Sequence, residues 1–308
     1  MIRQNGQSPP DRGLNGILLI DKPEGYTSFD VVAKVRGIAR TRKVGHGGTL
    51  DPMATGVLPL FLGTATKACD ILPDRTKAYE AWFQLGQTTD TQDRTGKLLT
   101  QSPFSCSKEQ VEAVLHRFQG DLMQVPPMYS AVWVQGRRLY DLAREGIEVE
   151  RQPRPVTVHE LRLLHAQEAQ GLYSIFVRCS KGTYVRTLCH DVGQALGCGA
   201  VMTTLRRVVS SGYRVEDAIT IAQAQQLADE GMLEQKVLPV ETAFSAYEAV
   251  RLSARQAVMF RNGVQLDAQK AGCAGMEGVF RVLDPDGAFL GLGIQKEGRL
   301  LIYKLFVR

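Results

Sequence analysis

Apolar residues along the chain follow two spacings, one typical of strands and one typical of amphipathic helices. Gly16–Asp21 is an almost continuous apolar run closed by Lys22 and Pro23, which predicts a buried strand. Thr27 or Ser28 then stands where a helix N-cap is expected. The apolar residues that follow lie on one helical stripe, and they are Val31, Val32, Val35 and Ile38. The beginning of the chain therefore predicts a strand followed by a helix.

The same two spacings continue to about residue 230 and predict a mixed α+β domain. Ser107 to Gln110 is a capping box, which predicts a helix that buries Val111, Leu115 and their neighbours. Gly197 is placed to end another helix. The remaining expected elements are a short helix over Ala65–Leu72, strands over Lys77–Leu85, Leu172–Cys179 and Val201–Ser210, and helices over Tyr184–Leu196 and Thr220–Glu230.

Two stretches interrupt this pattern. Between Pro126 and Pro155 the composition shifts to Pro, Tyr, Gly and Arg, which indicates an exposed insertion rather than core. After about residue 247, short apolar runs alternate with turn signals such as Asp284 to Gly287, which predicts a small barrel of short strands. We therefore expect two domains, residues 1–247 with an insertion at 126–155, and residues 248–308.

Composition narrows the class of protein. Hydrophobic residues make up 44% and charged residues 22% of the 308, which is typical of a globular protein with a proper core. We expect no membrane span, because no window approaches the roughly 18 apolar residues that one needs. The stretch MIRQNGQSPPDRG shows no secretory h-region, so we expect a cytoplasmic protein. The six cysteines form no CxxC pair, which argues against a disulfide framework or a zinc site.

Positive charge is slightly in excess, with a net charge of +5 and a pI of about 8.9. Basic residues gather at several separate points, which suits a folded nucleic acid contacted in several places. Any one of these clusters, taken alone, is more often a solvated face. The clusters are Arg36, Arg40, Arg42 and Lys43; Arg137, Arg138 and Arg144; Arg151 and Arg154; and Arg206 and Arg207.

The loop from Gly45 to Gly56 is the most unusual local sequence of the chain, because it places one acid, Asp51, among several glycines. Glycine lets a large ligand approach the backbone closely. Pro52 biases Asp51 toward an extended backbone and so fixes the direction of its side chain. The residues alone leave two readings open, an ordinary Asp-Pro turn and a catalytic acid. A phosphate-binding P-loop is excluded, because the GxxxxGK[ST] spacing is missing.

The whole string GHGGTLDPMATG resembles the signature of the TruB family of tRNA pseudouridine-55 synthases. Further stretches resemble family blocks in the family's order, among them LLIDKPEGYTSFDVV, KAYEAWFQLGQTTDTQDRTG, VPPMYSAV, SKGTYVRTLCHDVGQALGCGA and LRRVVSSGY. The resemblance implies an α+β fold with a mixed, mainly antiparallel central sheet flanked by helices. It also implies a C-terminal PUA-like RNA-binding domain and isomerisation of uridine 55 in the T loop of tRNA.

The resemblance assigns roles to six residues. Asp51 matches the family's catalytic aspartate, and Arg186 matches the arginine paired with it. The other four match substrate-binding positions: His46 for holding the flipped-out loop, Tyr79 for stacking on the target base, Tyr184 for packing against that tyrosine, and Leu205 for an apolar wall.

General chemistry is consistent with these implied roles. A uridine packed inside folded tRNA must be extruded before an enzyme can reach it. Stacking on an aromatic face returns about 1–3 kcal/mol per base, which helps to offset the extrusion. An enclosed pocket disfavours an ionised carboxylate, whereas a guanidinium held beside it favours that form.

Two residues depart from the family pattern. Gly47 stands where the family usually has Thr or Ala, which predicts a more mobile loop in the free protein. Trp133 stands where the family commonly has Lys, which predicts the loss of a phosphate contact and the gain of a stacking contact. Both departures bear on affinity for the substrate rather than on catalysis.

The resemblance implies a stand-alone, monomeric enzyme that binds the T-stem loop of tRNA, with no cofactor, metal, guide RNA or obligate protein partner. Three alternatives remain open: a guide-RNA-dependent member of the superfamily, an N-glycosidase that releases uracil, and an RNA-folding chaperone. The chemical route also stays open, because Asp51 could attack the sugar C1′, attack C6 of the base, or abstract a ribose proton.

Overall fold

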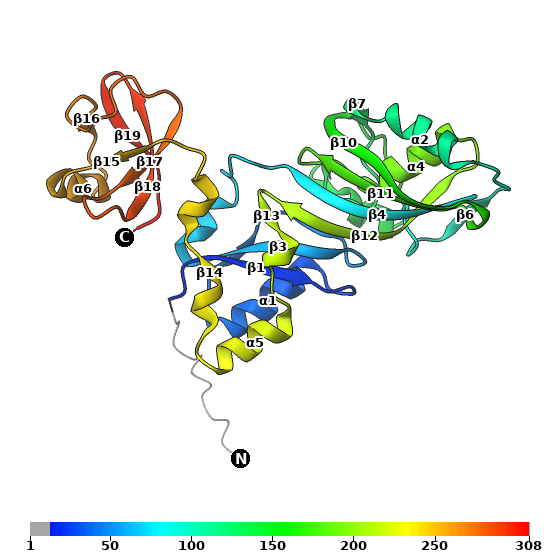
Figure 1. Cartoon of the computed structure of the whole chain (residues 1–308), viewed down its shortest axis with the longest axis horizontal. Coiled ribbons are helices and arrows are strands. Elements are labelled where there is room, and N and C mark those ends of the chain that lie inside the picture. The colour runs from blue at the N-terminus through cyan, green and yellow to red at the C-terminus, as the bar shows by residue number, and fades with distance from the viewer. Residues whose placement is uncertain (1–12, 308) are drawn as a thin grey trace, which may run out of the picture.

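A computed structural model describes residues 13–307 of the chain, and its centre is one long twisted sheet (Figure 1). The sheet order is β14-β1-β3-β12-β4-β11-β10-β7, with β2 added beside β3 and β13 beside β12. Within this sheet β12 pairs in parallel with β3, and the other pairs are antiparallel. This confirms the expected mixed, mainly antiparallel sheet. Its strands are β1 Gly16–Lys22, β2 Val44–His46, β3 Thr55–Leu62, β4 Lys77–Leu85, β7 Gly120–Gln124, β10 Arg154–Gln167, β11 Leu172–Cys179, β12 Ala200–Ser210, β13 Tyr213–Arg214 and β14 Val237–Leu238.

Helices cover both halves of this sheet. Helices α1 (Ser28–Ile38) and α5 (Ile221–Asp229) pack together over β1 and β3, and their apolar faces form one core. Helices α2 (Lys108–His116) and α4 (Val185–Ala195) pack over the other half and form a second core with β4, β11 and β12. Capping boxes begin α1, α2 and α5, as the sequence predicts for Ser107, and of the two expected N-caps of α1 it is Thr27 that caps the helix.

The functional part of the sheet is the place where β3 and β12 run side by side. Gly56 has φ +107°, and a Cβ there would lie 2.2 Å from the carbonyl oxygen of Arg207. Only glycine permits so close an approach of the two backbones. The loop Gly47–Ala54, which precedes β3 and which we call the Asp51 loop, is thereby held beside β4 and β12.

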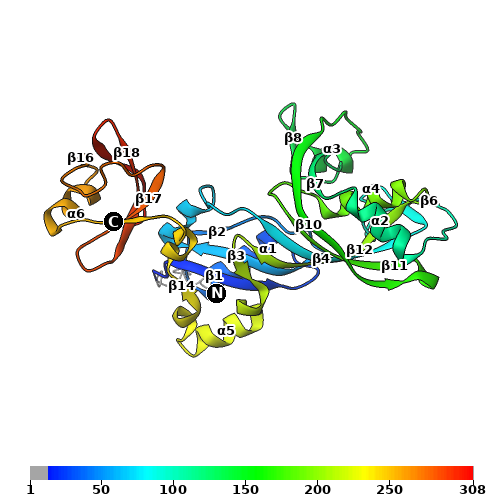
Figure 2. The ribbon, with the colours of Figure 1, turned by 45° about the horizontal axis from the view of Figure 1, so that its top comes forward.

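The insertion differs in part from its sequence-based interpretation. It contains the hairpin β8 (Trp133–Val134) and β9 (Arg137–Arg138), followed by α3 (Leu139–Arg144), and stands clear of the main sheet (Figure 2). Leu139 and Leu142 of α3 are buried, so the insertion has packed residues of its own. Its expected end is also wrong, because β10 begins at Arg154 and pairs there with β7.

The C-terminal region forms a separate five-stranded sheet, curled into a half-barrel, in the order β15-β17-β18-β19-β16. Its own core includes Phe260, Phe280 and Leu300. Helix α6 (Ala254–Arg261) also belongs to it, although the strand pattern gave no sign of a helix there. The strands are β15 Ala249–Arg251, β16 Leu266–Asp267, β17 Val279–Leu283, β18 Phe289–Lys296 and β19 Arg299–Leu305.

Short elements complete the chain. The helix expected over Ala65–Leu72 is instead the 3-10 helix η1, Gly63–Ala68, and the turns after it end before Pro73. None of the helices in residues 13–307 is long and apolar enough to cross a membrane. The N-terminal stretch interpreted as lacking a secretory signal lies, up to residue 12, outside the described residues. The other short elements are β5 Gln87–Thr89, β6 Leu98–Gln101, η2 Glu168–Gln170, η3 Val215–Asp217, η4 Leu233–Lys236 and η5 Val240–Phe244.

Candidate active site

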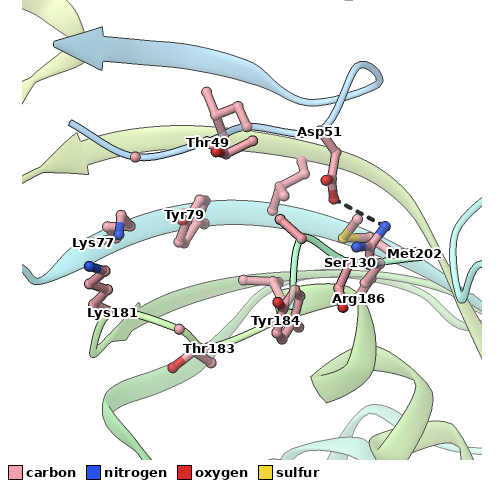
Figure 3. Close-up of a pocket in the computed structure, with 16 residues that line it drawn as sticks. Thr49, Asp51, Lys77, Tyr79, Ser130, Lys181, Thr183, Tyr184, Arg186 and Met202 are labelled. Carbon is pink, nitrogen blue, oxygen red and sulfur yellow. Dashed lines mark ion pairs between the residues drawn. The ribbon is translucent and has the colours of Figure 1, made fainter. Parts of the chain in front are cut away.

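A pocket of about 280 Å³ opens between the Asp51 loop, β4, β12 and the start of α4 (Figure 3). Five of the six residues singled out from the sequence line it: Asp51, Tyr79, Tyr184, Arg186 and Leu205. They come from four places in the chain, because Tyr184 and Arg186 both lie at the start of α4, and the pairing of β3 with β12 and the β11–α4 turn bring them together. The sixth, His46, lies outside the lining.

The Asp51 loop is anchored by side chains from three other elements. The Ser28 hydroxyl accepts a hydrogen bond from the Leu50 amide at 2.9 Å and donates to the Leu50 carbonyl at 3.2 Å. The fully buried Arg207 donates to Val57, Thr49 and Gly48 carbonyls. These bonds reach both sides of Asp51 and so hold its carboxylate in place, on the loop for which Gly47 predicts greater mobility in the free protein.

Lys22 completes this support. Its side chain is fully buried, and its ammonium donates to the carbonyls of Pro23, Tyr26 and Pro52. Burial lowers the pKa of Lys22 to about 8, and the nearby Asp51 carboxylate opposes that shift. The lysine therefore holds the residue after Asp51 and places a second positive charge near its carboxylate.

Arg186 joins two carboxylates. Its Nη1 lies 3.2 Å from Oδ2 of Asp51 and 3.5 Å from Oδ2 of Asp93, while its Nη2 donates to the Tyr129 carbonyl at 2.6 Å. Only 6% of the Arg186 side chain is exposed, compared with 35% for Asp51. Asp51 thus presents its carboxylate to the pocket, and Arg186 holds it from behind.

Asp93 is a functional candidate that the sequence interpretation missed. Its Oδ1 accepts hydrogen bonds from the Thr91 hydroxyl, the Thr95 hydroxyl and the Thr95 amide, which leaves Oδ2 free to face Arg186. The side chain is only 3% exposed. A buried carboxylate needs such compensation. The Thr-x-Asp-x-Thr spacing inside TDTQDRTG is the signal that could have identified it.

Tyr79 and Tyr184 lie on facing walls of the pocket (Figure 3). Burial raises the pKa of Tyr79 to about 12, and the adjacent Arg207 guanidinium only partly opposes this, so the ring stays neutral. The backbone of Tyr184 is fixed by two bonds with the Gln124 amide group, of 2.8 and 3.1 Å. Leu205 supplies an apolar surface and is 6% exposed. This arrangement fits a flat, uncharged ring between aromatic walls.

His46 lies at the end of β2, beside the pocket rather than in it. Its Nδ1 accepts a hydrogen bond from the Gly48 amide at 3.3 Å, and its ring meets the exposed Phe29 edge-on at 5.7 Å. Burial lowers the pKa of His46, and the Arg207 charge lowers it further. His46 is therefore a neutral ring at neutral pH, held next to the Asp51 loop.

The two departures from the family pattern have distinct surroundings. The Gly47 amide donates to the Pro59 carbonyl, and a Cβ at Gly47 would lie 3.3 Å from the Phe61 ring. Trp133 is 61% exposed, and the guanidinium carbon of Arg138 lies 5.3 Å from the centre of its ring. The tryptophan therefore offers a free face for stacking, and the stacking contact with substrate stays a prediction.

We predict that Asp93→Asn lowers the turnover number by roughly 10- to 100-fold and the free energy of unfolding by about 2–3 kcal/mol. The change keeps the shape of the side chain but removes the charge that faces Arg186. Asp90→Asn is the matched control, because Asp90 lies on the same loop and contacts Tyr129 and Lys97 instead. Initial rates and urea denaturation check both effects, and equal rates for the two variants would contradict the role of Asp93.

Known proteins are similar to this chain over most of its length. Residues 36–185 match the family model described as TruB family pseudouridylate synthase, N-terminal domain, and residues 186–245 match that of the tRNA pseudouridylate synthase B C-terminal domain. The tRNA pseudouridine synthase B proteins of Escherichia coli K12 and of Shigella flexneri serotype 5b are 41% identical over 307 residues, which is 96% of each chain.

Solved structures show the same fold. A chain from a Cbf5-Nop10-Gar1 complex superposes with a TM-score of 0.71 at 24% identity, and covers 99% of this chain and 92% of its own. A chain from an H/ACA RNP bound to a substrate RNA containing 2′-deoxyuridine superposes with a TM-score of 0.70 at 23% identity. The match covers 99% of this chain and 93% of that one.

Proposed function

The chain belongs to the TruB family of pseudouridylate synthases and isomerises uridine 55 of tRNA to pseudouridine, and we propose that Asp51 is the carboxylate that performs this chemistry. The observation that supports the proposal best is the Asp51–Arg186 pair, backed by the buried Asp93, at the edge of a pocket with aromatic walls.

The reaction makes limited demands on the protein. The bond between N1 of uracil and C1′ of ribose breaks, the base turns, and a bond forms between C5 and C1′. The hydrogen on C5 leaves as a proton, and N1 takes up a proton, so atoms and electrons balance without an oxidant or reductant. Three routes satisfy this balance: attack of the carboxylate at C1′, attack at C6, and abstraction of a ribose proton.

Each of the other residues has a part in the proposal. Tyr79 stacks on the extruded uracil, Tyr184 and Leu205 close the pocket around it, and Arg186 holds the Asp51 carboxylate in a fixed orientation. His46, beside the pocket rather than inside it, contacts the RNA loop from which the base was extruded.

We further propose that the enzyme acts alone on the T-stem loop, as a cytoplasmic monomer. The match in sequence is to tRNA pseudouridine synthase B proteins, whereas the complexes with Cbf5 are similar in fold alone. The test is incubation of the pure protein with an unmodified tRNA transcript, followed by nucleoside analysis. Formation of pseudouridine with the tRNA as the sole RNA present supports the proposal. Release of free uracil would indicate an N-glycosidase. A requirement for a guide RNA would exclude a stand-alone enzyme.

The proposed division into residues 1–247 and 248–308 is supported by the separate C-terminal core and by family matches that end at residue 245. One apolar cluster is shared across the seam, with Leu292 and Phe306 on one side and Ile17 and Phe61 on the other. Removing the small domain therefore exposes apolar surface, and a truncated chain has to be shown to fold before it is assayed.

We expect a folded chain ending at Tyr247 to have a higher KM for tRNA with kcat largely preserved. The reason is that contacts of the small domain with tRNA stabilise the bound substrate and the transition state equally. The salt dependence of tRNA binding should also become shallower, since fewer phosphates are neutralised. Steady-state kinetics and filter binding at several salt concentrations measure both. Full affinity with a reduced kcat would mean that the small domain shapes the pocket instead.

A further inference from the structure

Two lysines lie at the end of the pocket remote from Asp51. Lys77 is the first residue of β4, and Lys181 lies in the turn between β11 and α4. Both line the pocket, and their ammonium groups point toward each other (Figure 3). Tyr79 and Tyr184 lie between this lysine pair and the Asp51–Arg186 pair.

The lysine pair differs from the other cations around the pocket. Lys22 and Arg207 each donate to three backbone carbonyls, and Arg186 faces two carboxylates. Within residues 13–307, neither Lys77 nor Lys181 makes an ion pair or a side-chain hydrogen bond. Two unpaired ammonium groups facing each other repel, and an anion placed between them would relieve that repulsion.

The surroundings of Lys77 make it sensitive to such an anion. Burial lowers the pKa of Lys77 to about 8, and Arg207 on β12, Lys181 and Arg75 lower it too. Cys179 on the neighbouring β11 is the one facing group with an opposite effect. At neutral pH, Lys77 is therefore mostly protonated in a place where its charge is costly.

The chemistry of the substrate identifies the anion. Uracil and ribose are uncharged, so phosphates are the anionic groups that an RNA brings into the pocket. We propose that Lys77 and Lys181 bind a backbone phosphate next to the extruded uridine, while the base lies at Tyr79. This inference rests on the proposed function, and it adds a binding subsite that anchors the flipped nucleotide at the end opposite the reacting carbons.

Gly48 connects this subsite to the Asp51 loop. A Cβ at Gly48 would lie 3.2 Å from Cε of Lys77 and 3.4 Å from its Nζ, so the lysine packs directly against the glycine backbone. Lys77 therefore lies against the same loop that carries Asp51. A phosphate held there has a fixed position relative to the Asp51 carboxylate.

The test compares tRNA binding by Lys77→Met, Lys181→Met and Lys236→Met. Lys236 is an exposed lysine outside the pocket lining and serves as the matched control. We expect each pocket variant to bind tRNA about tenfold more weakly and to lower the slope of log affinity against log salt by roughly one phosphate contact. The effect should fall on KM more than on kcat, because the contact exists before and during the reaction.

The affinity for tRNA, measured over a series of pH values, distinguishes a charge contact from a merely structural role of Lys77. Protonated Lys77 attracts the phosphate, so the affinity of the wild type should fall as pH rises from 7 through about 8 to roughly 9.5. Lys22 titrates in the same range but is present in both proteins. The wild type and Lys77→Met should therefore converge in affinity at high pH. Lys77→Arg should restore tight binding and keep its advantage over Lys77→Met at high pH, since arginine stays charged.

Two results would overturn the inference. One is an unchanged salt slope in Lys77→Met, and the other is a loss confined to kcat, which would place the lysines on the base rather than on a phosphate. Pseudouridine is measured in the same wild-type samples. Absence of pseudouridine there defeats the proposed function, whereas its presence with unchanged binding in Lys77→Met defeats only the phosphate subsite.

Discussion

Asp51→Asn is expected to abolish formation of pseudouridine, with a loss of roughly 1000-fold or more in turnover, while affinity for tRNA stays within a few-fold. Asparagine keeps the size of the side chain and the turn in which the Ala54 amide donates to the Asp51 carbonyl. It cannot attack carbon or accept a proton as a carboxylate does. Affinity depends mostly on phosphate contacts, which this change leaves in place.

Nucleoside analysis of the product and equilibrium binding of tRNA measure the two effects separately. Asp21→Asn is the matched control, because Asp21 pairs with Arg206 outside the pocket at 2.8 Å. Wild-type turnover in the control shows that loss of an aspartate charge is not harmful in itself. Substantial turnover in Asp51→Asn would remove the carboxylate from the mechanism.

Arg186→Lys is expected to lower kcat by roughly 100-fold although the charge is kept. The guanidinium makes three contacts, because Nη1 lies between the carboxylates of Asp51 and Asp93 and Nη2 donates to the Tyr129 carbonyl. A lysine ammonium on a shorter chain cannot reach all three groups at once, so Asp51 loses its orientation.

Arg206→Lys is the control for this change, since Arg206 makes a two-pronged pair with Asp21 at 2.8 and 3.1 Å. That pair lies outside the pocket lining, so its weakening should leave kcat near that of the wild type. Initial rates at saturating tRNA decide between the two variants. Equal kcat values for Arg186→Lys and the wild type would show that a positive charge alone is sufficient.

Local patterns were enough to predict several elements around the site, although the central strands β3 and β10 were not among them. The predicted strand Lys77–Leu85 is β4 residue for residue, and the cap at Thr27 begins α1 as expected. These signals succeed because apolar spacing and capping chemistry act over a few residues. Helix α6 was not predicted, because the short apolar runs around it have the spacing of strands. The capping box formed by Ser253 and Gln256 is the local signal for this helix.

Features that depend on contacts between distant segments could not be predicted from local sequence patterns. Arg207 donates to carbonyls about 150 positions earlier in the chain, and no local pattern distinguishes it from its neighbour Arg206, which is partly exposed. Asp93 is a partial exception, because the Thr-x-Asp-x-Thr spacing marks it in the sequence, whereas its contact with Arg186 on another element does not follow from that spacing.

The site residues came from resemblance rather than from local chemistry. On residues alone, Asp51 could not be separated from an acid in an ordinary Asp-Pro turn. The structure brings Asp51 next to Arg186 in a pocket with Tyr79 and Tyr184, while His46 stays outside the lining. The role that the resemblance implies for His46, holding the flipped-out loop, stays a prediction.

The most direct measurement of the central claim is release of tritium from tRNA labelled at C5 of uridine, in a single turnover with enzyme in excess. Formation of the bond between C5 and C1′ expels the C5 hydrogen, so the signal reports chemistry rather than binding or product release. We predict that the wild type, with no other RNA present, releases the label from one uridine per tRNA. Asp51→Asn should release none while the tRNA is fully bound. Release by Asp51→Asn at about a tenth of the wild-type rate or faster, a barrier change of no more than about 1.4 kcal/mol, would contradict the account.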